Sequence, residues 1–183
     1  MNYIFLTGLV GSIVLVAGAA WPEPTGAKHP VKSFKNWLFA VGGLAMLIYA
    51  IFGYMQGGPV FFVILEILVA IANVLMMLNT PDRIDAPIIT ISGLGFIVWS
   101  LYLFENYNIV LFVFGLAAVG LGYAFQMGTL RRSVALTLGS VLIALFSYFE
   151  ASWIFFWLNV FFAIFSAYFL YKKLAQRREL VIN

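Results

Sequence analysis

The chain has 183 residues, of which 64% are hydrophobic and 9% are charged, and its formal net charge is +3. An average soluble domain has about 25% charged and about 45–50% apolar residues, so these proportions exclude a soluble enzyme, a nucleic-acid-binding domain and a disordered segment. The absence of cysteine from the sequence excludes disulfides, thiolate metal sites and cysteine nucleophiles.

Seven segments are apolar enough to cross a bilayer as helices, which takes about 20 residues each. Membrane-spanning strands alternate apolar and polar residues, whereas Val110–Phe125 is apolar almost throughout, so we expect an all-α integral membrane protein. In chain order the expected helices are Tyr3–Trp21, Trp37–Met55, Val60–Leu78, Ala86–Phe104, Asn108–Phe125, Val134–Phe149 and Trp153–Tyr171. The sixth is the shortest, and we expect it to take one or two residues from its flanks.

Helix-breaking residues separate these segments. Trp21-Pro22-Glu23-Pro24 follows the first, Gly57-Gly58-Pro59 follows the second, and Thr80-Pro81 follows the third. The connections at 105–107 and 150–152 are short, so the helices that they join should be antiparallel neighbours. No stretch of the sequence remains for a soluble domain.

All ten basic residues fall at one end of the expected bundle. With seven spans they lie in the first, third and fifth connections and in the C-terminal tail, and the opposite connections have none. They are Lys28, Lys32, Lys35, Arg83, Arg131, Arg132, Lys172, Lys173, Arg177 and Arg178. Because Lys and Arg in short loops mark the cytoplasmic face, we expect a protein of the cytoplasmic (inner or plasma) membrane with its N-terminus outside and its C-terminus in the cytoplasm.

The first apolar segment could also be a signal peptide, since Ala17-Gly18-Ala19 resembles a small-residue cleavage site. However, Met1-Asn2 supplies no basic region before the apolar run, and the run is long enough to span a membrane. We therefore expect the first helix to be retained.

The third and seventh helices share a pattern that indicates an internal repeat. Each carries three small or polar residues on one helical face, and the two sets lie 93 residues apart: Glu66, Ala70 and Asn73 against Asn159, Ala163 and Ser166. The second and sixth helices match with an offset of 97, with Gly42, Gly43 and Tyr49 against Gly139, Ser140 and Phe146. We therefore expect two parallel three-helix repeats, 1–79 and 108–183, joined by a linker helix within 80–107.

This three-plus-one-plus-three plan resembles the SWEET sugar transporters of the PQ-loop (MtN3) superfamily, and each half resembles a bacterial SemiSWEET. The segment Leu38–Gly43, followed by Tyr49 and Pro59, is similar to that family's second and third helices. The resemblance implies a carrier that moves a small, sugar-like solute by alternating access between the two halves.

The same resemblance assigns roles to individual residues. The family's Pro-Gln pair would fall on Pro22-Glu23 and on Phe125-Gln126. Pro22, Pro24 and Gln126 are therefore the expected gating or hinge positions. The family's binding asparagine on the third helix of each half would fall on Asn159 in the second half, and on Glu66 or Asn73 in the first.

Two other interpretations stay open. Asn36-Trp37, followed by the Gly and Tyr residues of the second helix, resembles the PnuC vitamin transporters, which share the helix plan and would imply a vitamin or nucleoside facilitator. The chain could instead be a non-transporting membrane subunit or assembly factor, whose polar residues serve helix packing. No chemical reaction is expected under any of these interpretations.

Glu66 is the only ionisable residue well inside an expected span. A carboxylate in hydrocarbon costs roughly 2.5 kcal/mol or more, so it normally faces protein or water, and we expect a substrate ligand or a proton-coupling group. Asn73 and Asn159 can donate and accept hydrogen bonds at once, which suits a hydroxylated or amide-bearing solute, although each could equally tie two helices together.

No cofactor or metal is expected, because the sequence has one histidine and no carboxylate pair in a span. The expected partners are a small solute and the lipid bilayer. Association into a homo-oligomer stays open.

Overall fold

The computed structural model describes residues 3–21, 30–104, 106–126 and 129–182, and these residues form seven α-helices and one short 3-10 turn, with no strand among them. The elements are α1 (Tyr3–Ala20), η1 (Pro30–Lys32), α2 (Phe34–Met55), α3 (Phe61–Leu78), α4 (Asp82–Tyr102), α5 (Asn108–Ala124), α6 (Leu130–Phe149) and α7 (Trp153–Ile182). The all-α fold and the seven expected helices are confirmed.

Six of these helices are long and apolar enough to cross a membrane. The seventh, α5, has 17 residues and lies at the short limit of the usual range of about 17–25. Large apolar side chains cover the outside of the bundle, for example Ile91, Phe114 and Val74, which are exposed by 71%, 63% and 57%. A water-soluble monomer does not expose apolar surface on this scale, whereas hydrocarbon solvates it.

Three helices begin earlier than the apolar segments predicted. The Ser33 side chain caps α2 by accepting from the backbone N–H of Asn36, and Thr129 caps α6 by accepting from that of Arg132. Helix α4 begins directly after Pro81. The basic residues expected in connections therefore lie in the first turns of helices: Lys35 in α2, Arg83 in α4, and Arg131 and Arg132 in α6.

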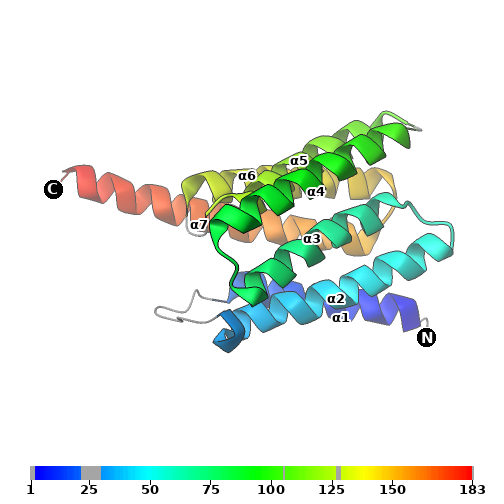
Figure 1. Ribbon diagram of the computed structural model, residues 1–183, viewed down its shortest axis with the longest axis horizontal. Coiled ribbons are helices and arrows are strands. Elements are labelled where there is room, and N and C mark those ends of the chain that lie inside the picture. The colour runs from blue at the N-terminus through cyan, green and yellow to red at the C-terminus, as the bar shows by residue number, and fades with distance from the viewer. Residues whose placement is uncertain (1–2, 22–29, 105, 127–128, 183) are drawn as a thin grey trace.

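Helix α7 continues beyond the expected end at Tyr171 as far as Ile182. Its 30 residues correspond to about 45 Å at 1.5 Å per residue, more than the roughly 30 Å of hydrocarbon in a bilayer. The basic residues after Tyr171 thus extend a helix rather than forming an irregular tail, and this part of α7 projects from the bundle (Figure 1).

Neighbouring helices in the chain are neighbours in space. Each of α1 to α7 packs against the next, α7 returns to pack against α1, and α3 also contacts α5. Helix α4 contacts only α3 and α5 in the described part of the chain, so the other six helices enclose the interior and α4 packs outside them. The ring runs through α1, α2, α3, α5, α6 and α7 and back to α1, so α3 and α7 are not neighbours in it but lie three places apart.

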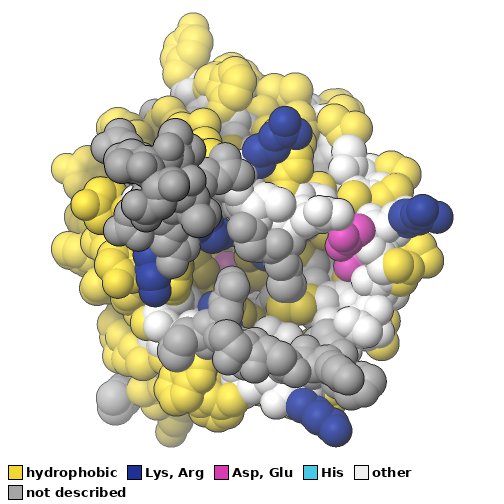
Figure 2. Space-filling view, turned by 90° about the vertical axis from the view of Figure 1, so that its left-hand side faces the viewer, with side chains coloured by type: hydrophobic (Ala, Val, Ile, Leu, Met, Phe, Trp, Pro, Cys, Tyr) yellow, Lys and Arg dark blue, Asp and Glu magenta, His cyan; other side chains and the backbone are white. Residues whose placement is uncertain are grey.

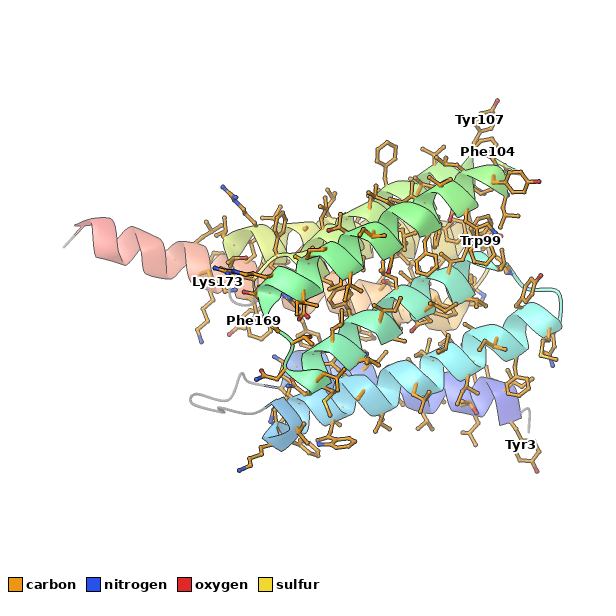
Figure 3. The ribbon with its side chains drawn as sticks, in the orientation of Figure 1. Tyr3, Trp99, Phe104, Tyr107, Phe169 and Lys173 are labelled. Atoms are coloured by element: carbon orange, nitrogen blue, oxygen red, sulfur yellow. The ribbon has the colours of Figure 1, made fainter. Side chains whose placement is uncertain are left out.

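The two ends of the bundle differ in charge. The basic end, where α1–α2, α3–α4 and α5–α6 connect and α7 projects, carries the described residues Lys32, Lys35, Arg83, Arg131, Arg132, Lys172 and Lys173. Figure 2 faces this end and shows Lys and Arg side chains spread across it. At the opposite end lie Tyr3, Phe104 and Tyr107, as Figure 3 shows, while Phe169 and Lys173 lie toward the basic end.

Two glycines bring helices of each half into close contact. A Cβ atom at Gly42 would lie 2.9 Å from the backbone nitrogen of Leu15 and 3.1 Å from the carbonyl oxygen of Gly11. A Cβ atom at Gly139 would lie 2.8 Å from the backbone nitrogen of Val119 and 3.1 Å from the carbonyl oxygen of Gly115. The α1–α2 and α5–α6 contacts are therefore backbone to backbone, which small residues permit.

Gly42→Ala and Gly139→Ala should each lower the free energy of unfolding by about 1–3 kcal/mol, because the added methyl group meets backbone atoms that cannot move independently. Gly95→Ala is the matched control, since nothing lies within 4 Å of a Cβ atom there and alanine favours a helix. Thermal unfolding in detergent measures all three. Equal unfolding temperatures for the three variants would contradict the close contacts.

Candidate functional site

The interior is crossed by an aromatic layer near the end opposite the basic end. Its members come from five helices: Tyr49 of α2, Phe61 and Phe62 of α3, Phe112 of α5, Phe146 of α6 and Phe155 of α7. The rings of Phe62 and Phe155 stack in parallel, with centroids 4.2 Å apart and an interplanar angle of 7°. Phe146 and Tyr49 pack against this pair at 5.5 Å from Phe62 and 5.6 Å from Phe155. The stack joins α3 to α7 across the interior.

Glu66 lies one turn beyond Phe62 on α3. Its side chain is 3% exposed, and its Oε2 atom is buried without a hydrogen-bond partner among the described residues. The side chains at Ile64, Leu65 and Leu68 around it are buried and apolar. A buried polar group without a partner costs free energy, so this carboxyl group destabilises the fold as it stands and needs an explanation in function.

Asn159 occupies the corresponding place on α7, one turn beyond Phe155. Its side chain is 8% exposed, and its Nδ2 donates to the carbonyl oxygen of Phe155 at 2.9 Å. Residues four apart share a helical face. Because the Phe62 and Phe155 rings meet, the faces that carry Glu66 and Asn159 are turned toward each other across the interior. Two of the three expected binding residues therefore each follow one turn after a ring of the Phe62–Phe155 stack.

Asn73 lies apart from that pair, about two turns further along α3 toward the basic end. It is 8% exposed, and its Nδ2 donates to the carbonyl oxygen of Phe39 on α2 at 3.1 Å. Gly43 makes room for it, since a Cβ atom there would lie 2.7 Å from this nitrogen. Asn73 therefore ties α3 to α2, which is the packing role that the sequence left open.

A recess near the opposite end shares three residues with the aromatic layer. It has a volume of about 310 Å³ and lies between α1, α2, the start of α3, the α6–α7 turn and the start of α7. Tyr49, Phe62 and Phe155 of the layer line it, together with Tyr54, Glu150 and Trp153 among others. We call it the outer recess.

A smaller recess of about 60 Å³ lies near the basic end, and we call it the inner recess. Its polar lining residues are Asn73, Asp82, Asp85, Tyr123 and Arg132. The Arg132 guanidinium donates from Nη1 to the carbonyl oxygen of Phe125 at 3.2 Å and lies 5.7 Å from the centre of the Tyr123 ring. Tyr123 is close enough to both Arg132 and Glu66 for their charges to act on its hydroxyl group.

The sequence did not single out Tyr123, Asp85 or Arg132. Arg132 was expected in the fifth connection, as one of the basic residues that mark the cytoplasmic side. The capping residue Thr129 was the available signal, because it starts α6 early enough to place Arg132 inside the first helical turn.

The structure describes one of the three expected hinge residues. Pro22 and Pro24 lie outside the described residues. Gln126 is exposed in the α5–α6 connection, where its carbonyl oxygen accepts from the backbone N–H and the hydroxyl group of Thr129 at 3.3 and 2.8 Å. No three His, Cys, Asp or Glu side chains gather as metal ligands within the part of the chain that the structure describes.

No family model, curated protein or solved structure matches this chain.

Proposed function

We propose that the protein is a membrane carrier that moves a small polar solute by alternating access between two three-helix halves, α1–α3 and α5–α7. The observation that carries this proposal is Glu66, a buried carboxyl group with an unpartnered oxygen on a helix, α3, that contributes residues to two recesses near opposite ends of the bundle. Intramembrane ionisable residues mark solute or ion pathways by default.

The matching glycine contacts support two equivalent halves. Gly11, Leu15 and Gly42 in the first half correspond in position and contact distance to Gly115, Val119 and Gly139 in the second. The α1 residues recur 104 positions later in α5, and Gly42 recurs 97 positions later. Helix contacts follow the same symmetry, since α3 with α5 corresponds to α7 with α1.

The aromatic layer adds further support for the repeat. Phe62 and Phe155 are 93 residues apart, as Glu66 and Asn159 are, and Tyr49 and Phe146 are 97 apart. The Tyr49–Phe155 and Phe146–Phe62 contacts, at 5.6 and 5.5 Å, are therefore equivalent pairs. Parallel repeats with a solute site near the midplane between them are one established plan for secondary transporters.

In the proposed cycle the Phe62–Phe155 stack closes the outer recess from Glu66 and Asn159. Rocking the halves apart at the outer end would separate the rings and admit a solute, and rocking them apart at the basic end would release it toward the inner recess. The basic end would face the cytoplasm, because Lys and Arg concentrate on that side. The carboxyl group of Glu66 and the amide of Asn159 would hydrogen-bond the solute in between, which suits a hydroxylated, sugar-like compound.

A vitamin or nucleoside facilitator of the PnuC type uses the same geometry with a different solute. A specific observation favours the non-transporting alternative: the amides of Asn73 and Asn159 both donate to backbone carbonyl groups, as structural asparagines do. This alternative leaves two carboxyl groups unexplained, because Oε2 of Glu66 and Oδ1 of Asp85 are both buried without a hydrogen-bond partner among the described residues.

Uptake by reconstituted vesicles tests the proposal. Purified protein in liposomes is assayed with labelled sugars, nucleosides, vitamins and small amines, against empty liposomes. The proposal predicts saturable uptake of at least one solute that an unlabelled excess competes away. Uptake no faster than in empty liposomes for every class would contradict it.

A further inference from the structure

Six of the fourteen residues that line the outer recess are aromatic. They come from α1, α2, α3 and α7, and they are Phe5, Tyr49, Tyr54, Phe62, Trp153 and Phe155. The volume of about 310 Å³ lies at the lower end of the range for small-molecule sites, about 300–1,000 Å³, which fits a compact metabolite rather than a peptide. An aromatic ring attracts a cation placed over its face more strongly than a neutral apolar group of the same shape.

The charges around the outer recess have one sign. Among the described residues that line it, Glu150 is acidic and none is a lysine, arginine or histidine. The connections at this end, 56–60, 103–107 and 150–152, contain Glu105 and Glu150 and no lysine or arginine. Acidic residues without lysine or arginine in these connections favour the approach of cations over that of anions.

A second carboxyl group lies one helical turn from a residue of the recess lining. Glu66 follows one turn after Phe62, and its buried Oε2 has no hydrogen-bond partner in the described part of the chain. In the proposed cycle this carboxyl group is the next polar group that a solute from the outer recess would reach.

We infer that the outer recess binds a small organic cation, a quaternary or protonated amine with a compact apolar body. In the transport cycle this recess would be the first site at which the solute binds. The inference rests on the proposed function for the transport step, but binding at the recess does not require transport. It also narrows the solute class, because a hydroxylated amine would satisfy both the carboxyl group of Glu66 and the amide of Asn159.

Calorimetric titration of the protein in maltoside detergent tests this inference, with choline as the probe. The comparison ligand is 3,3-dimethyl-1-butanol, in which carbon replaces the charged nitrogen at nearly the same shape. We expect saturable choline binding that is about tenfold or more tighter than that of the neutral isostere. Glu150→Gln and Trp153→Leu should each weaken choline binding about fivefold or more.

The matched control is Tyr107→Leu, which removes an aromatic residue at the same end, 88% exposed and outside the recess lining, and should leave choline affinity unchanged. Equal affinity for choline and its isostere, or equal affinity of the Glu150 and Trp153 variants and the wild type, would overturn the inference. So would tighter binding of dihexanoylphosphatidylcholine than of choline, because the recess would then hold a lipid headgroup.

The outcomes separate the two proposals. Choline binding that depends on Glu150 and Trp153, without uptake of any solute by liposomes, would support the cation site and contradict the carrier. Saturable uptake of neutral sugars without choline binding would support the carrier and overturn the cation site.

Discussion

Replacing Glu66 with glutamine is expected to lower solute uptake about tenfold or more while leaving the unfolding temperature unchanged or higher. An unpartnered carboxyl group is an unfavourable feature of the folded interior, and a charged side chain at the bilayer centre costs roughly 2.5–3.5 kcal/mol. A neutral amide of the same shape removes that cost and also removes the negative charge that would hold a solute or a proton. Stability and activity should therefore change in opposite directions, as at many functional sites.

A further variant and a pH series test the role of the carboxyl group. Glu66→Asp keeps a carboxyl group and should retain part of the uptake, and if Glu66 couples transport to protons, the pH dependence of uptake should be absent from Glu66→Gln alone. Thermal unfolding and initial uptake rates are measured on the same preparations. A glutamine variant that transports normally and unfolds at a lower temperature would mean that Glu66 has a structural role, as in a non-transporting subunit.

The Phe62–Phe155 stack should give the largest effect on stability. Phe155 is 1% exposed and Phe62 is 4% exposed, so Phe155→Ala should cost about 3–5 kcal/mol through lost burial and a cavity. A double-mutant cycle of Phe62→Ala and Phe155→Ala should give a coupling energy of about 0.5–1.5 kcal/mol for the stacked rings. In the proposed cycle the stack closes the outer recess from Glu66, so the milder Phe155→Leu variant should let solute leak down its gradient in both directions.

Phe161→Ala is the control on the same helix, because this ring is 41% exposed on the outside of the bundle. It should change neither the leak nor the unfolding temperature by more than a small amount. A leak as low in Phe155→Leu as in the wild type, with a normal unfolding temperature in Phe155→Ala, would contradict a closed aromatic layer.

The helices were predictable because their apolar runs have no competing interpretation in a chain with so few charges. Their starts were less predictable. Hydropathy detects the part of a helix that hydrocarbon covers, whereas the first turn of α6 depends on the hydrogen bond from the Arg132 N–H to Thr129. The same reasoning missed that α7 continues past Tyr171, since a polar sequence can extend a helix outside the membrane.

For the candidate site, sequence reasoning found Glu66 because a lone ionisable residue in a span needs no structural context. It did not find that Phe62 and Phe155 meet, although the offset of 93 residues already linked Glu66 to Asn159. Helical periodicity assigns a residue to a face but does not say which faces of distant helices meet. Sequence reasoning also grouped Asn73 with Glu66 and Asn159. It could not show which helix the Asn73 side chain meets, and in the structure its amide donates to the carbonyl oxygen of Phe39 on α2.

The exposure of Asn159 to each face of the membrane in turn tests alternating access most directly. Because the sequence has no cysteine, only an introduced cysteine can react with a thiol reagent. Asn159→Cys is treated with a membrane-impermeant maleimide applied to one face of the membrane at a time, with Ser152→Cys and Gln126→Cys as controls for the outer face and the basic end. The carrier account predicts that each control reacts from its own face only, whereas Asn159→Cys reacts from both faces and more slowly when solute is present. Protection of Asn159→Cys from both faces, with both controls reactive, would contradict it.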